Sequence, residues 1–514
     1  MAQRTEIPFN FFDRVVAYIS PATGLRRMQA RRVLSQYEAA KPSRLRKMTK
    51  DALSPNAVVQ HGATTLRALA RNLVENHDLA RGALGVLVNN VIGPNGIGIE
   101  PQPRRMDGTI HEEYAAALRD AYRDWQLIPE VTHRHHFSKV QRLVASTWLR
   151  DGECFSQRLI GPVPGLDHGT RVPYSLELIE ADLIPMDYHD IGKNIQQGIE
   201  RNAWGRPTGY YTYKEFPNGG IWSKHATEMK RIDVSRMHHI AMVDRIGQMR
   251  GVSVFASVIT RLEDIKDYEE SERIAAKVAA SLTAYVKKGD PTLYGNPNDG
   301  NAAGDGAPRE LGMAPGMVID SLLPGEEIGM IDSNRPNPNL INFRQGQLRA
   351  VAAGIQASYS SVARDYTGTY SGQRQELVEQ WINYAVLTDE FVGQYLQPTW
   401  IDFVAVAHLS GVVRIPKDVN PATVDDALFV GQSMPWIDPL KEAMAWHALV
   451  QDGFASEVEV IRKRGANPRD VLEQSAAHRT AAKEKGLVFK SDYANEQKNP
   501  QTANSDTESQ TEPA

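Results

Sequence analysis

Residues 342–398 restrict the possible folds of this chain more than any other stretch. Their first part places apolar residues at three- and four-residue steps, as on one face of an α-helix. These residues are Leu348, Val351, Ala352, Ile355, Tyr359 and Val362. Two glycines among hydroxyl residues then interrupt the pattern at 367–372, which favours a loop. A second apolar stripe follows, with Ser371 as the expected N-cap and Pro398 as the expected end. The sequence therefore predicts two helices joined by an exposed polar loop.

A longer helical pattern precedes this pair at residues 251–289. A continuous helix of that length would span roughly 55 Å. Residues 290–315 are rich in Gly, Asn, Asp, Pro and Ala and predict a loop. Residues 317–319 and 327–331 flank a Leu-Pro-Gly-Glu turn and predict a small hairpin. The order along the chain is therefore helix, small mixed insert, helix.

The rest of the chain mixes helices with short strands. Helical periodicity covers residues 55–92, 111–127, 137–151, 440–464 and 468–485. Short strands are expected at 155–160, 175–179, 209–213 and 237–240, because Gly and Pro punctuate the intervals between them. At 514 residues the chain is long enough for two or more structural regions.

The two ends of the chain differ from its centre in composition. Residues 1–54 carry many arginines and lysines among few large apolar side chains. Two interpretations remain open: an arm that contacts nucleic acid or a neighbouring subunit, and a solvated, partly helical extension. Residues 489–514 contain almost no large apolar group, so they predict a disordered tail.

Catalysis is not indicated, because the phosphate-binding loop, the zinc-protease helix motif and the hydrolase nucleophile elbow are all missing from the sequence. The only cysteine, Cys154, excludes an intrachain disulfide and is expected to be a small buried hydrophobe. The cluster at 133–136 contains three histidines, but a helix-entry segment is favoured over a metal site. The acids at 177, 180, 182 and 187 are expected on exposed strand faces. We expect no cofactor, no metal and no enzymatic activity.

Charge and hydropathy limit the possible partners. The formal net charge is only −4, which argues against binding nucleic acid through bulk positive charge but leaves a local basic ring possible. No apolar run suggests a signal peptide or a membrane span. We therefore expect neither secretion by a standard signal nor a membrane partner.

The run SVARDYTGTYSGQRQELVEQW, followed by GQSMPWIDP from Gly431, resembles the portal proteins of lambda-type tailed phages. The resemblance extends from about residue 55 to 487. It implies an α+β portal fold with a β-rich wing, long stem helices, a small mixed clip and a helical crown. The implied boundaries are a basic N-terminal arm at 1–54, wing at 55–250, stem at 251–289, clip at 290–339, second stem helix at 340–362, tunnel loop with the rest of the wing at 363–430, crown at 431–488 and a disordered tail at 489–514.

The resemblance also implies a function. Portal proteins of this family form a ring, here expected to have twelve subunits, at one capsid vertex, through which double-stranded DNA is packaged and ejected. The implied partners are the terminase large subunit, the major capsid or scaffold protein and head–tail connector proteins. The protein would assemble in the host cytoplasm and remain in the virion.

Two sets of site residues follow from the resemblance. The residues expected to line the DNA channel in the tunnel loop are Arg364, Tyr366, Thr367, Thr369, Tyr370, Ser371, Gln373 and Arg374. The residues expected to dock the motor are Arg309, Glu310, Glu326 and Glu327. A ring-forming scaffold or tail adaptor that does not conduct DNA remains the alternative. A polar, aromatic and basic surface at 363–374 is what distinguishes a DNA conduit from it.

Overall fold

The computed structural model describes residues 52–217, 228–281, 285–287, 327–329, 339–434 and 439–487, together with parts of 15–26. The chain divides into two units, Met1–Ser54 and Pro55–Ala514. The described parts of residues 15–26 in the first unit are mostly helical. Most of the expected N-terminal arm, most of the expected clip and the whole expected tail lie outside the described residues.

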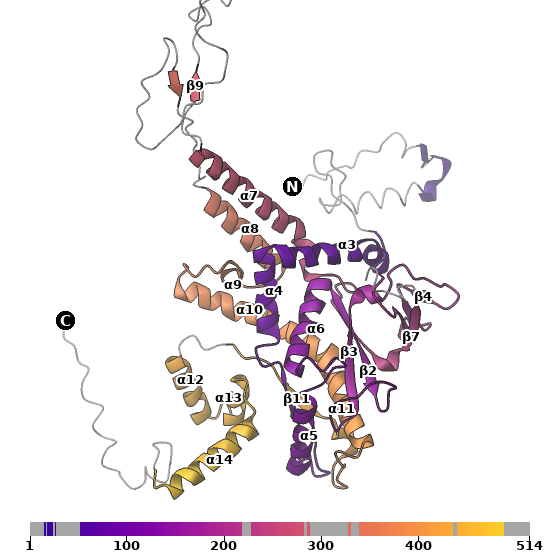
Figure 1. Cartoon of the computed structure of the whole chain (residues 1–514), viewed down its shortest axis with the longest axis vertical. Coiled ribbons are helices and arrows are strands. Elements are labelled where there is room, and N and C mark those ends of the chain that lie inside the picture. The colour runs from indigo at the N-terminus through magenta and orange to yellow at the C-terminus, as the bar shows by residue number, and fades with distance from the viewer. Residues whose placement is uncertain are drawn as a thin grey trace, which may run out of the picture. The chain divides into compact units, whose positions relative to one another are not determined.

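The second unit combines helices with antiparallel strands (Figure 1). Its first helices are α3 (Pro55–Asn76), α4 (Asp78–Val91), α5 (Glu112–Trp125) and α6 (Phe137–Asp151). They form in the predicted regions, although His77 splits the first of them by capping α4. The helices pack around buried aromatic rings, among them Trp125 and Trp148. This is the mixed helix and sheet architecture that the sequence predicts.

Two small antiparallel sheets follow α6. The first has the order β3-β2-β8, formed by β2 (Glu153–Ile160), β3 (Tyr174–Ile179) and β8 (Met237–Ala241). The second has the order β4-β5-β6-β7, formed by β4 (Ile195–Gln196), β5 (Ile199–Arg201), β6 (Pro207–Tyr213) and β7 (Met229–Asp233). A satellite core containing Phe155, Ile199 and Tyr210 joins them. The sequence predicts β2, β3, β6 and β8 but misses β4, β5 and β7, of which β4 and β5 are too short to show alternation.

A buried ion network ties α3, α6 and the chain before α7 together. Glu153 is fully buried and is bonded by Arg67 at 2.7 Å and by Arg250 Nε at 2.8 Å. Arg67 also pairs with Asp182 at 2.9 Å, and Arg71 binds Asp151, Asp182 and Glu180. The expectation that Glu180 and Asp182 belong to exposed strand faces is therefore wrong, since both end in this network.

The chain before α7 passes very close to the end of α6. Gly152 has φ +89°, and a Cβ at Gly251 would collide with the carbonyl oxygen of Gly152. The amide of Gly251 donates to Glu153 at 3.1 Å, and the amide of Met242 donates to Gly152 at 2.8 Å. Only glycine fits these two positions, because one requires the left-handed region and the other a direct backbone approach.

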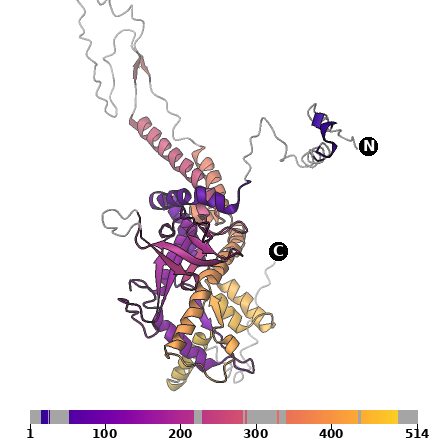
Figure 2. The ribbon, with the colours of Figure 1, turned by 90° about the vertical axis from the view of Figure 1, so that its right-hand side faces the viewer.

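The pair α7 (Ile259–Ser281) and α8 (Leu340–Gly354) extends away from the sheets in both ribbon views (Figures 1 and 2). Arg344 pairs with Glu269 at 2.5 Å, and the rings of Tyr268 and Phe343 lie 4.9 Å apart. The α-helix predicted at 251–289 is shorter than expected, because a 3-10 turn (Val254–Ser257) precedes α7 and residues 285–287 form β9.

The second strand of the predicted hairpin has a partner that the sequence analysis did not expect. Strand β10 (Glu327–Gly329) pairs with β9 (Tyr285–Lys287). Residues 317–319, the expected partner, lie outside the described residues. A Tyr-Val-Lys run suits a strand as well as a helix end, and only long-range pairing decides between them.

The helix predicted across 342–362 is broken. Helix α8 ends at Gly354, Gln356 adopts φ +54°, and Ser358 caps the five-residue α9 (Tyr359–Ala363). The helix α10 (Tyr370–Phe391) then runs through a π-helical segment, η7 (Val392–Leu396), into α11 (Gln397–Leu409). Pro398 therefore does not end this helix. It lies in the first turn of α11, where its missing N–H costs little once the π-helical segment has changed the hydrogen-bonding register.

The C-terminal part of the second unit pairs with a strand near its beginning. Strand β11 (Ala427–Val430) pairs with β1 (Gly98–Pro101), and α12 (Pro439–Gln451), α13 (Glu457–Lys463) and α14 (Pro468–Glu484) follow. The helix predicted at 440–464 is interrupted at 452–456, where Gly453 has φ +78°. The predicted joint before Pro468 is confirmed, with Asn467 as N-cap.

Candidate functional site

The residues predicted to line a channel lie in the loop after α9 and at the start of α10. Seven of the eight side chains are exposed and one, Gln373, is half-buried. They follow the end of α9 and enter the first turn of α10 in the order Arg364, Tyr366, Thr367, Thr369, Tyr370, Ser371, Gln373 and Arg374. The predicted N-cap at Ser371 is wrong: Thr369 caps α10, and its hydroxyl accepts from the amide of Gly372 at 3.3 Å.

Two carboxylates, which the sequence reasoning did not single out, determine the path of this segment. Asp365 accepts hydrogen bonds from the Thr367 amide at 3.2 Å, the Thr367 hydroxyl at 2.6 Å and the Tyr359 hydroxyl at 2.9 Å. The hydrogen bonds from Thr367 and Tyr359 hold the pKa of Asp365 below its usual value. An Asp-x-Thr spacing is the signature of an Asx turn, so the sequence did contain this signal.

Glu376, in the second turn of α10, contacts the start of α9. It accepts from the Ser358 hydroxyl at 2.8 Å, the Ser360 amide at 3.0 Å and the Ser360 hydroxyl at 2.6 Å. Partial burial opposes ionisation of this carboxylate, but these hydrogen bonds outweigh the burial and lower its pKa. The hydroxyl of Tyr384, further along α10, also accepts from the Ser358 amide at 3.2 Å.

A polar cavity of about 600 Å³ lies between α8, this segment and α10. Gln345 and Arg349 of α8 line one side, and Gln373 and Glu376 of α10 line the other. The guanidinium of Arg349 lies 5.2 Å from the centre of the Tyr359 ring. The polar groups that hold the segment line this cavity, and the hydroxyls of Thr367 and Thr369 are themselves used in holding it.

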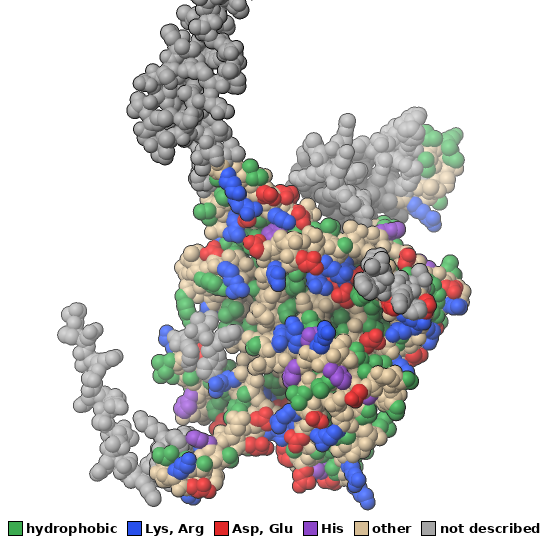
Figure 3. All heavy atoms as spheres, viewed as in Figure 1, with side chains coloured by type: hydrophobic (Ala, Val, Ile, Leu, Met, Phe, Trp, Pro, Cys, Tyr) green, Lys and Arg blue, Asp and Glu red, His purple; other side chains and the backbone are tan. Residues whose placement is uncertain are grey.

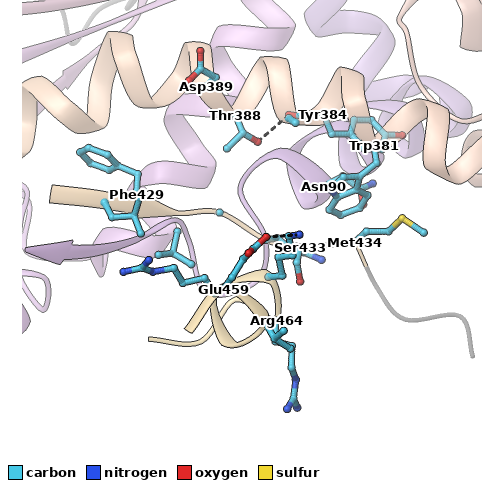
Figure 4. Close-up of a pocket in the computed structure, with 18 of the residues that line it drawn as sticks. Asn90, Trp381, Tyr384, Thr388, Asp389, Phe429, Ser433, Met434, Glu459 and Arg464 are labelled. Atoms are coloured by element: carbon cyan, nitrogen blue, oxygen red, sulfur yellow. Dashed lines mark hydrogen bonds and ion pairs between the residues drawn. The ribbon is translucent and has the colours of Figure 1, made fainter. Parts of the chain in front are cut away.

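A larger cavity of about 1000 Å³ lies between α10, β11 and the C-terminal helices (Figure 4). Figure 4 shows Trp381, Tyr384 and Thr388 of α10 on one side and Glu459 of α13 on the other. Arg374 lines this cavity, whereas its neighbour Gln373 lines the polar one. The two side chains therefore lie on different faces of α10.

A third face of α10 exposes apolar side chains. Val378, Ile382 and Val386 are spaced four residues apart, and Ile382 is 64 % exposed. Asp389 and Glu390 follow near the end of the helix, and burial together with the like charges of Asp389 and Asp244 raises the pKa of Glu390. We call Val378, Ile382 and Val386 the apolar row of α10. Figure 3 shows one face of the molecule, on which green apolar side chains are scattered among charged ones.

The residues predicted to dock a motor cannot be grouped in the same way. Arg309, Glu310 and Glu326 lie outside the described residues, and Glu327 begins β10. Glu327 is therefore the only one of the four with a described backbone position.

The histidine cluster at 133–136 and Cys154, the other residues considered for metal binding or catalysis, have structural roles in the fold. His136 accepts from the Ser138 amide as the N-cap of α6, in agreement with the predicted helix-entry segment. Cys154 is buried, as predicted, and burial raises the pKa of its thiol to about 12. In the described ranges, no three side chains of His, Cys, Asp or Glu are placed to hold a metal ion. Among the same residues, no helix has the length and apolar character needed to cross a bilayer.

Residues 41–387 match the family described as "Phage portal protein, lambda family". This chain belongs to that family. The matched range includes the whole 364–374 segment and ends within α10.

Individual relatives agree with the family. The probable portal protein of Halomonas phage phiHAP-1 is 24 % identical over 434 residues, which cover 81 % of this chain and 80 % of the relative. Portal protein B of Escherichia phage lambda is 21 % identical over 478 residues, or 86 % of this chain and 88 % of the relative. A chain in the virion of a native gene transfer agent particle is 12 % identical, with a TM-score of 0.45, and covers 80 % of this portal protein and 99 % of itself.

Proposed function

We propose that this portal protein forms a closed ring through which double-stranded DNA is packaged and ejected, at one vertex of the virion. The observation that carries the proposal is the family match across 41–387, which contains an exposed polar segment mounted between two helices. The proposed role is structural rather than catalytic, so ATP hydrolysis would belong to a separate motor.

The apolar row of α10 supports a ring. In a closed ring, each subunit presents one surface to the next, and this contact repeats around the axis. A large isoleucine such as Ile382 is unfavourable in water, and burial against a neighbour would stabilise it by roughly 1.5–3 kcal/mol. A twelve-subunit ring is the stoichiometry that the family resemblance implies.

The helix order supports the finer assignments. We assign α7 and α8 to the stem and the chain between them, including β9 and β10, to the clip. The two sheets, with α3 to α6 and α11, would form the wing, and α12 to α14 the crown. The clip, as a short insert between two long helices, is the proposed docking site of the terminase large subunit. Capsid or scaffold protein and head–tail connector proteins are the other proposed partners.

The exposed segment 364–374 is the proposed tunnel loop. Around a ring, one arginine per subunit becomes a collar of positive charge, and DNA presents one phosphate charge per ~1.7 Å of its axis. Arg364 and Arg374 are both exposed, and the tyrosines and hydroxyl residues between them offer a polar surface without a base-reading element. Contacts to phosphates alone would let DNA of any sequence pass.

The proposal is tested by electron microscopy of the purified chain, followed by packaging with the variant R364E/R374E. We expect rings with a central hole for both proteins and a loss of DNA packaging or retention for the variant. A monomer at micromolar concentration would contradict the ring. Variant rings that fill heads with DNA as well as wild type would favour the alternative, a ring-forming scaffold or tail adaptor that does not conduct DNA.

A further inference from the structure

We propose that Glu376 and Asp365 are positioning residues that clasp α9 and residues 364–369 between α8 and α10, so that the loop has one preset conformation. The role of that conformation in DNA passage rests on the proposed function of the loop. The clasp itself rests on the contacts within one subunit.

Helix α9 is too short to hold its own conformation. It has five residues, and isolated helices need many more before hydrogen bonding compensates for nucleation. On the upstream side, the chain leaves α8 at Gly354 and turns through Gln356 at φ +54°. Contacts from other elements must therefore fix α9. It packs against α4 and α8, and α10 supplies hydrogen bonds to its first residues.

Glu376 is the first part of the clasp. Its two carboxylate oxygens receive three hydrogen bonds, all from Ser358 and Ser360 at the start of α9. The Ser358 hydroxyl in turn accepts from the Ser361 amide at 3.2 Å and so caps α9. One carboxylate on α10 thus fixes both the position and the cap of α9.

Asp365 is the second part, at the opposite end of α9. It links the Tyr359 hydroxyl, in the first turn of α9, to the amide and hydroxyl of Thr367. Gln345 of α8 approaches the same carboxylate at 3.5 Å. Thr369 then begins α10 by capping it. Side-chain hydrogen bonds therefore hold both ends of the stretch from Ser358 to Thr369, and backbone bonds to the Ser360 carbonyl close the turn at Arg364.

The clasp also reaches α8. Gln345 of α8 contacts the Asp365 carboxylate, and the guanidinium of Arg349 lies 5.2 Å from the centre of the Tyr359 ring. Displacement of the loop would therefore have to break contacts to α8 as well as to α10.

The test compares E376A, D365A, the conservative variant E376Q and the control E379A in the purified full chain, whichever oligomeric state it adopts. Glu379 is exposed on the same helix, and E379A removes the same charge as E376A. Amide hydrogen exchange over residues 358–372 and trypsin cleavage after Arg364 report on the loop alone. Thermal unfolding reports on the whole chain.

We expect E376A and D365A to accelerate exchange in this segment by at least about tenfold, the factor for losing one hydrogen bond to a charged group. Exchange in α4 and the melting temperature should remain close to wild type. E376Q retains an oxygen acceptor for the Ser360 amide and should restore most of the protection.

Unchanged exchange and cleavage in E376A and D365A would overturn the clasp. A uniform rise in exchange together with a lower melting temperature would also overturn it, because that result indicates general destabilisation. If the segment loosens and DNA packaging remains normal, the clasp is supported and the proposed channel role of the loop is contradicted. Loosening with impaired packaging or retention supports both.

Discussion

Replacing Arg250 by methionine should strongly destabilise this portal protein, because the change strands a buried carboxylate. The Arg250 side chain is completely buried, and its Nε lies 2.8 Å and 2.9 Å from the two oxygens of Glu153. Its remaining donors reach the backbone carbonyls of Ala181, Ile184 and Gln197 at 2.8–3.2 Å. Methionine preserves most of the volume but removes the charge and all of these donors.

The expected cost follows from what remains in place. Glu153 would keep Arg67 at 2.7 Å, His239 at 3.3 Å and the Gly251 amide at 3.1 Å, but its burial would no longer be offset by Arg250. Removing one partner of a buried ion pair typically costs about 3–5 kcal/mol, and the three carbonyls left without this donor place R250M in that range. Replacing the exposed Arg414 by methionine should change the free energy of unfolding by less than about 0.5 kcal/mol.

Urea unfolding followed by tryptophan fluorescence measures this cost, because Trp125, Trp148 and Trp400 are all buried. Protein concentration must be matched, since the proposed ring would add to the apparent stability. A double-mutant cycle with E153Q identifies the cause: if the stranded carboxylate is responsible, E153Q should cost less in R250M than in wild type. A loss below about 1 kcal/mol for R250M, or strict additivity in the cycle, would refute this explanation.

The remaining predictions concern the interface, the backbone junction and pH. I382D should prevent ring formation, judged by light scattering, while leaving the thermal midpoint near wild type. The control L409D, at another exposed apolar position, should still form rings. Intact I382D rings would contradict the proposed interface. G251A should lower the free energy of unfolding by about 1–3 kcal/mol, because the added Cβ has no space beside the Gly152 carbonyl. An unchanged free energy would show that the backbones at residues 152 and 251 can move apart. Burial lowers the pKa of His238 and His239, so as the pH falls these histidines take up protons in the unfolded chain before they do so in the folded one. The free energy of unfolding should therefore decline below the histidine pKa of the unfolded chain, by at most about 1.4 kcal/mol per pH unit for each histidine. A urea midpoint that stays constant from pH 7.5 to about 5 would exclude this.

The helix–loop–helix core of the candidate site could be predicted from the sequence, because apolar periodicity and clustered glycines are local signals. The break at 355–358 could not. Ile355, Tyr359 and Val362 keep the helical phase on both sides of Gln356, so the stripe conceals a change of direction. The exchange of Ser371 for Thr369 as N-cap is similar, because both hydroxyl residues satisfy the same rule.

Long-range contacts account for the other differences. The pairing of β9 with β10 joins residues that are far apart in the sequence, beyond the reach of any periodicity argument. The buried ion network draws Glu180 and Asp182 toward Arg67 and Arg71 of α3, which no spacing near the acids reveals. Glu376 has the sequence character of an ordinary helix residue and only its partners distinguish it, whereas the Asp-x-Thr spacing at Asp365 is a local signal.

The π-helical segment between α10 and α11 affects how far the loop and α11 can vary independently. A residue added to or removed from a continuous helix rotates everything beyond it by about 100°. The wide turn at Val392–Leu396 allows α10 to present Glu376 to the loop while α11 keeps Trp400 and Phe403 in the core. The wide turn holds one residue more than an α-helical turn, so deleting one residue there would restore an ordinary turn and leave the core-facing side of α11 in place. A one-residue deletion elsewhere in α10 or α11 would instead swing that side toward solvent, so this short segment is where the long helix can change its length at least cost.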